Sequence, residues 1–363
     1  MTLRFASRLR RATPRVLGRA LSALSPVRAG DFAAAGRVLR GVHRFNRVGI
    51  IPDDARAAAL ELHCRTNGRF THGLAAALRV VHRPQPPRPV TGLLGQLAAA
   101  EQRRIAASLR RDGFHVFDTR LPSALCDEIE AFAKATPAII AGSDHVRPDQ
   151  RRRFDPAAPE GKKYYFAEAE IVANRGMQRL MGDPMLLAVA ESYLATPPVL
   201  SDVTLWWSGV HVGTPGADAG QSFHFDFDTP PGWLMFFFYL TDVGPENGPH
   251  VVVRGSHRDR SKAAGALRAR GYARIGDDDI VAAFGAERIV ELHGKRGTVL
   301  AVDTQCFHKG LALRSGCRLM GQLVYSFPQF AGAHRNRLSL PSDIEPALAR
   351  AMADRPDVYA KYR

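Results

Sequence analysis

The chain has 363 residues, of which 45% are hydrophobic, and a formal net charge of +15. This length and composition allow a large buried core in one domain or in two. No stretch reaches the roughly 18 uncharged apolar residues that a membrane-spanning helix needs, so an integral membrane protein is not expected. The cysteines Cys64, Cys126, Cys306 and Cys317 show no paired spacing, which predicts reduced thiols and a cytoplasmic location.

The positive charge belongs to the N-terminal part of the chain. Residues 1–115 hold 21 arginines, no lysine and six acidic residues, which accounts for the whole excess of positive charge. Apolar residues recur at helical spacing over 16–24, with Arg15 and Arg19 off that stripe, so a basic amphipathic helix is predicted. Two interpretations stay open: peripheral contact of residues 1–25 with an anionic membrane surface, or a solvated face on a packing helix. No specific nucleic-acid partner is expected.

The change in composition along the chain predicts three parts. Residues 1–92 form a basic, Arg-rich helical extension that ends in a Pro-rich linker over 83–89. Residues 93–335 form the main domain and begin with a helix predicted over 93–111. Residues 336–363 form a C-terminal tail that contains a helix over 342–354.

Two further helices are predicted at 121–136 and 183–194. The second has a start signal, because Asp183 can cap the first turn and Pro184 suits the first helical position. The polar stretch 144–163 between these helices predicts a loop over the mouth of a site.

Four apolar runs are typical of buried strands. They span 203–210, 233–240, 297–302 and 318–327. The run 233–240 is strongly aromatic, and a strand buried on both faces is favoured there over a substrate pocket. Residues 259–288 form an Ala- and Arg-rich insertion between strands that is expected to be helical in part and to shape substrate access.

Ligand chemistry is concentrated in the segment from Gln221 to Asp226. His224 and Asp226 are two residues apart, so on a strand they share one face while Phe225 and Phe227 point the other way. His308 follows the strand run 297–302 and offers a second imidazole. Two imidazoles and one carboxylate leave open positions on a ferrous ion, which predicts an iron oxygenase.

Other residues compete for these roles. Asp228 is on the same face, but four steps along a strand place it about 13 Å from His224, so Asp226 is favoured as the ligand. Four other histidines are interpreted as structural or surface residues. These are His211, His250, His257 and His293.

The stretch from about 112 to 330 resembles the phytanoyl-CoA dioxygenase family of Fe(II)/2-oxoglutarate oxygenases. The resemblance rests on the order and spacing of short motifs. They are Arg111-Asp-Gly-Phe-His-Val-Phe117, Gln221 to Asp226, Tyr239 to Val243, Glu246-Asn-Gly248, Arg254-Gly-Ser-His257, Asp303 to Gly310, and Arg318. Arg254 stands where members often have proline, in a turn that does not touch the ligand set.

The resemblance implies a fold and a site. The fold is α+β with a mainly β core, a double-stranded β-helix (jelly-roll, cupin-like) with buttressing helices and a helical N-terminal extension. The implied iron ligands are His224, Asp226 and His308. Arg318 is implied to bind the distal carboxylate of 2-oxoglutarate, and Gln221 to contact the co-substrate or the substrate. Arg314 stays a rival to Arg318, because the spacing from the distal histidine varies among relatives.

The implied activity is a dioxygenase that uses Fe(II), 2-oxoglutarate and O2. It would hydroxylate a small organic substrate, with release of succinate and CO2. Neither the identity of the substrate nor the oligomeric state is predicted. Two alternatives remain: a cupin-like metalloenzyme that does not use 2-oxoglutarate, and a non-catalytic protein that binds membranes or nucleic acid through the basic extension.

Overall fold

The structure is a computed structural model that describes residues 29–48, 50–141, 150–210, 221–227, 230–328 and 337–362. The basic helix expected over 16–24 and the membrane contact expected of residues 1–25 lie outside these residues, as do His211 and Asp228. Among the described helices, none is both long enough and apolar enough to cross a membrane.

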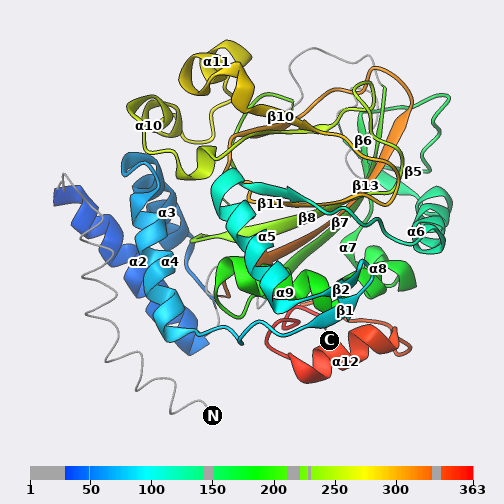
Figure 1. The fold of residues 1–363 in the computed structure, drawn as a ribbon, viewed down its shortest axis with the longest axis horizontal. Coiled ribbons are helices and arrows are strands. Elements are labelled where there is room, and N and C mark those ends of the chain that lie inside the picture. The colour runs from blue at the N-terminus through cyan, green and yellow to red at the C-terminus, as the bar shows by residue number, and fades with distance from the viewer. Residues whose placement is uncertain are drawn as a thin grey trace.

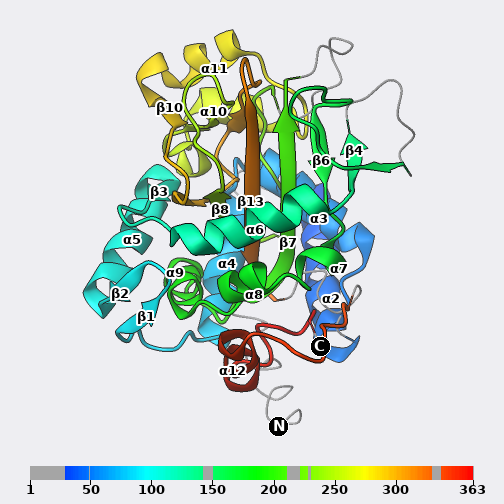
Figure 2. The ribbon, with the colours of Figure 1, turned by 90° about the vertical axis from the view of Figure 1, so that its right-hand side faces the viewer.

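An eight-stranded sheet forms the centre of the molecule, and all of its pairings are antiparallel. Its strand order is β3-β11-β8-β13-β7-β6-β4-β5. The strands are β3 (Phe114–Val116), β4 (Ala138–Ala141), β5 (Arg151–Arg152), β6 (Lys163–Tyr165), β7 (Val199–Gly209), β8 (Trp233–Tyr239), β11 (Val299–Val302) and β13 (Cys317–Ser326). The long strands β7 and β13 lie side by side (Figure 2). Every residue of β8 is buried, which confirms that this aromatic run is a strand covered on both faces.

A second, three-stranded antiparallel sheet has the order β10-β9-β12. It consists of β9 (His250–Val253), β10 (Ile289–Leu292) and β12 (His308–Gly310). Two antiparallel sheets with helices around them form the expected double-stranded β-helix with a mainly β core.

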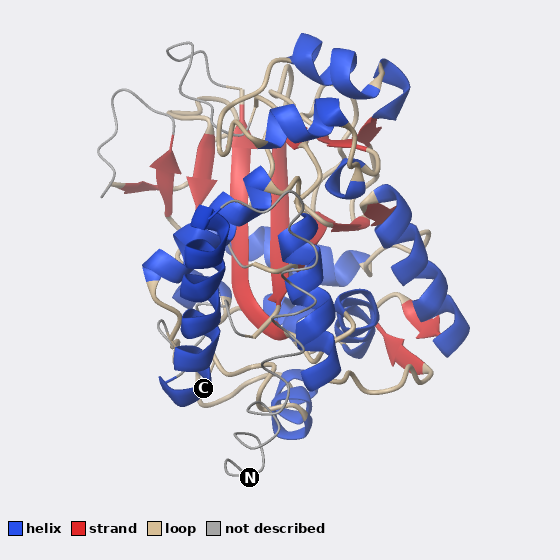
Figure 3. Ribbon diagram, turned by 90° about the vertical axis from the view of Figure 1, so that its left-hand side faces the viewer, coloured by secondary structure: helices blue, strands red, loops and turns tan. Residues whose placement is uncertain are grey.

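The helical extension packs along one flank of the sheets (Figures 1 and 3). It contains α2 (Ala29–Val48), α3 (Asp53–Arg65) and α4 (Arg69–Val81), so the prediction of helices is confirmed for these residues. Ala34, Leu62 and Leu74 are buried in the same apolar cluster as the strands. The ring of His63, in α3, lies 5.5 Å from that of Phe225 and 4.6 Å from that of Phe227. The extension therefore supports the segment that carries His224 and Asp226.

The remaining helices surround the large sheet. They are α5 (Ala99–Asp112), α6 (Ser123–Ala135), α7 (Glu168–Ile171), α8 (Arg175–Met181), α9 (Pro184–Leu194), α10 (Lys262–Arg268), α11 (Asp277–Phe284) and α12 (Pro346–Asp354), with 3-10 turns at Ser256–Arg258 and Ala286–Arg288. Asp183 caps α9 as predicted, because its Oδ1 accepts hydrogen bonds from the backbone N–H groups of Met185 and Leu186 at 2.9 and 3.0 Å. The insertion over 259–288 contains α10 and α11, as expected.

Two helix starts differ from prediction. The helix expected from residue 93 begins at 99, because β1 (Val90–Gly92) and β2 (Gly95–Leu97) form a hairpin whose turn uses the positive φ of Gly95. The last helix begins at Pro346 instead of 342, with proline in its first turn. The loop expected over 144–163 contains β5, and its first residues lie outside the described part. The division of the chain at 92/93 and 335/336 stays a prediction.

Candidate metal centre

Backbone pairing brings the two ends of the candidate site together. The N–H of His224 donates to the carbonyl of His308 at 3.0 Å, and the N–H of His308 donates back at 2.8 Å. Two residues further on, the N–H of Asp226 donates to the carbonyl of Thr304 at 2.9 Å. These bonds hold the segment 223–227 against the turn that leads into β12.

Side chains alternate along this segment as the sequence predicts. Phe223, Phe225 and Phe227 are buried in the core, whereas His224 and Asp226 are only partly buried and share the other face. The strand expected here is reduced to isolated bridges at Phe223 and His224. The alternation survives because an extended backbone suffices to place residues i and i+2 on one side.

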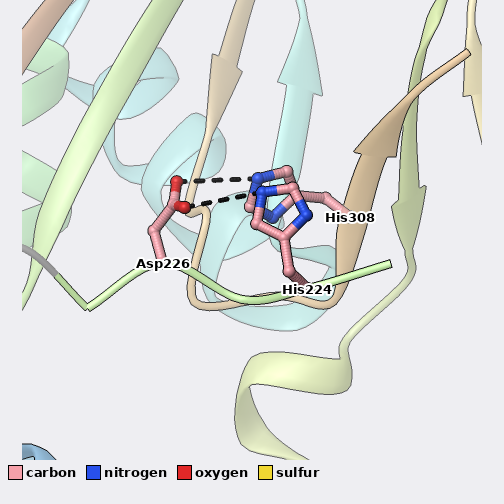
Figure 4. Close-up of side chains that lie close together, drawn as sticks. All are labelled: His224, Asp226 and His308. Carbon is pink, nitrogen blue, oxygen red and sulfur yellow. Dashed lines mark ion pairs between the residues drawn. The ribbon is translucent and has the colours of Figure 1, made fainter. Parts of the chain in front are cut away.

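The three donor side chains converge on one point (Figure 4). His224 Nε2 lies 3.7 Å from Asp226 Oδ1, and His308 Nε2 lies 3.5 Å from Asp226 Oδ2. The two imidazole centroids are 4.3 Å apart. One ligand atom from each residue falls within 4.8 Å of the others, so the three could share a single metal ion.

Hydrogen bonds fix which ring nitrogen faces this point. Nδ1 of His224 lies 2.9 Å from the carbonyl oxygen of Ser222, and Nδ1 of His308 lies 2.9 Å from that of Cys306. A carbonyl oxygen only accepts, so each Nδ1 carries the proton and each Nε2 keeps its lone pair for a ligand. Both histidines are thus oriented by the backbone two residues before them.

Electrostatics favour the neutral form of His224. Burial, followed by the neighbouring His308, lowers the pKa of His224 to about 4. The unprotonated imidazole is the form that binds metals, so at neutral pH no proton has to leave before coordination.

Arg318 lies in β13 and is buried at 5% exposure. Its Nη2 is 3.5 Å from Ser208 Oγ, while Nε and Nη1 have no hydrogen-bond partner among the described residues. Burial lowers the pKa of this guanidinium, because desolvation disfavours its charged form. A buried cation with two free donors is suited to an anionic ligand.

A cavity of about 120 Å³ opens beside Arg318. Ser208, Gln221, Lys162 and Lys163 also line it, so Gln221 and Arg318 border the same cavity. The rival Arg314 is exposed, and its guanidinium lies 3.5 Å from the carboxylate of Glu246. Only Arg318, of these two arginines, borders the cavity.

His250, which the sequence interpretation made a structural or surface residue, lies against the candidate metal centre. Its ring stacks on that of His308 with centroids 5.3 Å apart, and its buried Nε2 has no hydrogen-bond partner in the described part of the chain. Burial lowers its pKa strongly, with further contributions from His308 and Arg318. His250 reaches His308 through the register between β9 and β12, which places His250 opposite Gly310. Local sequence does not predict this register.

Two of the four histidines interpreted as structural or surface residues, His257 and His293, fit that interpretation. His257 is buried with Nδ1 3.1 Å from the thiol sulfur of Cys306. His293 is exposed and contacts Glu291 at 2.9 Å.

Several solved structures are similar to this chain. The epimerase SnoN, in complex with Fe3+, alpha ketoglutarate and nogalamycin RO, has 21% identity over 62% of this chain and 84% of that chain, with a TM-score of 0.44. EctD from S. alaskensis with 2-oxoglutarate and 5-hydroxyectoine has 22% identity over 73% and 88%, with a TM-score of 0.44. AviO1 from Streptomyces viridochromogenes Tue57 has 18% identity over 62% and 95%, with a TM-score of 0.42. No curated protein sequence matches the chain.

A jelly-roll core that presents two imidazoles and a carboxylate at one point is the arrangement of the double-stranded β-helix oxygenases that depend on iron and 2-oxoglutarate. The sequence model of one such family, phytanoyl-CoA dioxygenase (PhyH), matches residues 109–320, which is more than half of the chain. The protein belongs to this family. Iron, 2-oxoglutarate and O2 are accordingly its cofactor and co-substrates.

Proposed function

We propose that the protein is a dioxygenase that hydroxylates a small organic substrate with Fe(II) held by His224, Asp226 and His308. The observation that carries this proposal is the convergence of two Nε2 lone pairs and one carboxylate, with both imidazoles oriented by backbone carbonyls. This set occupies one side of a metal and leaves the other side for small molecules.

The donor separations fit a metal ion. With metal–ligand bonds of about 2.1 Å, two donors at a right angle are roughly 3.0 Å apart. The distances of 3.7 and 3.5 Å from Asp226 to the two imidazoles are only slightly longer. A small inward rotation of the carboxylate closes this difference, because Asp226 is the most exposed of the three side chains.

The co-substrate is assigned to the cavity beside Arg318. The unpaired Nη1 of Arg318, together with Nη2, whose contact with Ser208 Oγ is long at 3.5 Å, can donate two parallel hydrogen bonds to the distal carboxylate of 2-oxoglutarate. Gln221 lines the same cavity and supplies a further polar contact. His250 lies against His308, with ring centroids 5.3 Å apart, so it flanks one of the proposed iron ligands.

When bound, iron and 2-oxoglutarate supply the oxidation: O2, 2-oxoglutarate and a substrate C–H bond give succinate, CO2 and a C–OH bond. The chain positions the reactants and shields them from water. Arg318 orients the co-substrate, and the buried ring of His250 packs against those of His308 and Phe237, with centroids 5.3 and 5.0 Å away.

The test is Fe(II)-dependent formation of succinate from 2-oxoglutarate by the purified protein. We expect turnover in the wild type, accelerated by the correct substrate, and background rates in His224→Ala and Asp226→Ala. His293→Ala is the matched control, because His293 is exposed and pairs only with Glu291 among the described residues. Succinate formation that is equal with and without Fe(II), or unchanged in both site variants, would contradict the proposal.

A further inference from the structure

A second cavity, of about 200 Å³, shares no lining residue with the cavity beside Arg318. Its walls come from α4 of the N-terminal extension, the end of α9, the start of β8 and the turn that follows β11. The polar side chains that line it are His72, Arg79, Tyr193, Trp233, His257, Arg258, Asp303 and Gln305. None of His224, Asp226, His308 and Arg318 borders it.

Gln305, which lines this cavity, has a buried acceptor that is not used. The residue is 3% exposed, and its Nε2 donates to the carbonyl oxygen of Pro231 at 3.3 Å. Its Oε1 has no hydrogen-bond partner in the part of the chain that the structure describes. A buried side-chain acceptor without a partner is uncommon in folded proteins, and it is explained if a ligand that carries an N–H or O–H group binds here.

Two arginines give the cavity its positive charge. Nε of Arg79 donates to the carbonyl oxygen of Leu194 at 2.8 Å, and the guanidinium lies 5.8 Å from the centre of the Phe327 ring. This arrangement holds Arg79 in place in α4, where burial lowers its pKa. Arg258 is exposed and lines the same cavity from the 3-10 turn at Ser256–Arg258.

The one carboxylate in the wall, that of Asp303, is already engaged. Its Oδ1 accepts from the backbone N–H of Gln305 at 2.9 Å, and its Oδ2 accepts from the hydroxyl of Tyr193. Asp303 therefore repels an incoming anion less than a free carboxylate would. The two arginines set the sign of the charge that the cavity attracts.

We propose that this cavity binds a small carboxylate or phosphate that also carries a hydroxyl or amino group. The anionic group pairs with Arg79 and Arg258, and the donor group satisfies Oε1 of Gln305. The volume is that of roughly seven water molecules, which suits a small metabolite.

Such a ligand would touch the turn that orients a candidate iron ligand. Gln305 immediately precedes Cys306, whose carbonyl oxygen lies 2.9 Å from Nδ1 of His308. The wall on the other side is α4, so the ligand would also join the N-terminal extension to the catalytic turn. The inference extends beyond the proposed oxygenase activity, and its binding test does not depend on turnover.

The experiment is anaerobic calorimetric titration of the full-length protein, loaded with one equivalent each of Fe(II) and 2-oxoglutarate, by three probes: glycolate, acetate and inorganic phosphate. We expect saturable binding of glycolate or phosphate, with acetate weaker than glycolate because it lacks the hydroxyl donor. A preference for glycolate identifies the carboxylate class, and a preference for phosphate identifies the phosphate class.

Three variants locate the binding. Arg258→Gln, at an exposed position, and Arg79→Gln are each expected to weaken the preferred probe by about tenfold, the usual effect of losing one charge-assisted hydrogen bond. Arg254→Gln is the matched control, because Arg254 is exposed on the same segment and does not line the cavity. Absence of saturable binding by every probe would overturn the proposal. So would binding that both cavity variants retain in full but Arg318→Ala loses.

Discussion

The imidazole rings of His224 and His308 lie with their centroids 4.3 Å apart, across a reciprocal pair of backbone hydrogen bonds. The two residues are far apart in sequence, yet the same bridge fixes both main chains and both ring positions. The fold thus places two of the three candidate ligands by backbone geometry, before any metal contributes.

Replacement of Arg318 tests the assignment of the co-substrate site. Arg318→Ala is expected to raise the KM for 2-oxoglutarate by about ten- to a hundredfold, because a charge-assisted hydrogen-bond pair is lost. Iron binding should persist, since Arg318 is not among the candidate ligands. Arg314→Ala, at an exposed arginine four positions earlier, should leave the KM unchanged. Steady-state kinetics measure the KM of each variant for 2-oxoglutarate. Loss of iron from Arg318→Ala without any change in this KM would assign Arg318 a structural role.

Gly113 tests how tightly the metal-bearing turn is packed. It has a φ of +85°, and a Cβ at this position would overlap the sulfur of Cys306. Gly113→Ala is expected to cost about 2–4 kcal/mol of unfolding free energy, from backbone strain plus overpacking, and to weaken iron binding by displacing Cys306.

Gly271→Ala provides the control for backbone strain alone. Gly271 has a φ of +67°, and a Cβ there meets no described atom within 4 Å. Its replacement should cost about 1 kcal/mol and leave iron affinity intact. Equal costs for the two variants in urea denaturation would show that Cys306 yields without penalty.

Asp183 joins the hairpin of β1 and β2 to α9. Its Oδ1 caps the helix, and its Oδ2 accepts from the backbone N–H of Leu93 at 2.6 Å. Asp183→Ala is expected to destabilise the protein by about 2–3 kcal/mol, because buried backbone donors lose their acceptor. Asp183→Asn keeps one oxygen and should cost clearly less. Chemical denaturation measures both, and identical losses would argue against the capping account.

Stability should fall in mild acid because of His72. Burial, followed by the nearby Arg260, lowers the pKa of His72 to about 2, against about 6.5 in an unfolded chain. The folded protein therefore binds fewer protons, and the contribution of His72 is complete above pH 6.5 and is lost as the pH falls. At pH 5 the loss amounts to about 2 kcal/mol.

The measurement is the difference in pH dependence between wild type and His72→Gln. Between pH 7.5 and pH 5, the unfolding free energy should fall by about 2 kcal/mol less in His72→Gln than in the wild type, because glutamine does not titrate. Parallel pH profiles for the two proteins would contradict a half-buried, neutral His72.

Local sequence patterns predicted the parts of the site that depend on neighbouring residues. The two-residue spacing of His224 and Asp226 places them on one face, and Asp183 before Pro184 marks a helix start. Both follow from backbone geometry that a short segment determines by itself.

Features that depend on strand register or on packing between distant segments could not be predicted. His250 reaches His308 only because β9 pairs with β12 in one register. The cavity between Arg79 and Gln305 exists only because α4 packs beside the turn after β11. The hairpin over 90–97 replaced part of a predicted helix because Gly95 allows a turn that helical periodicity does not reveal.

The central claim is that His224, Asp226 and His308 hold iron, and anaerobic titration with Fe(II) tests it most directly. The wild type and His293→Ala should each bind one iron per chain. Asp226→Ala and His308→Ala should lose that binding while their circular dichroism and unfolding transitions show a folded protein. Iron bound in the same stoichiometry and with the same affinity by both site variants would contradict the claim.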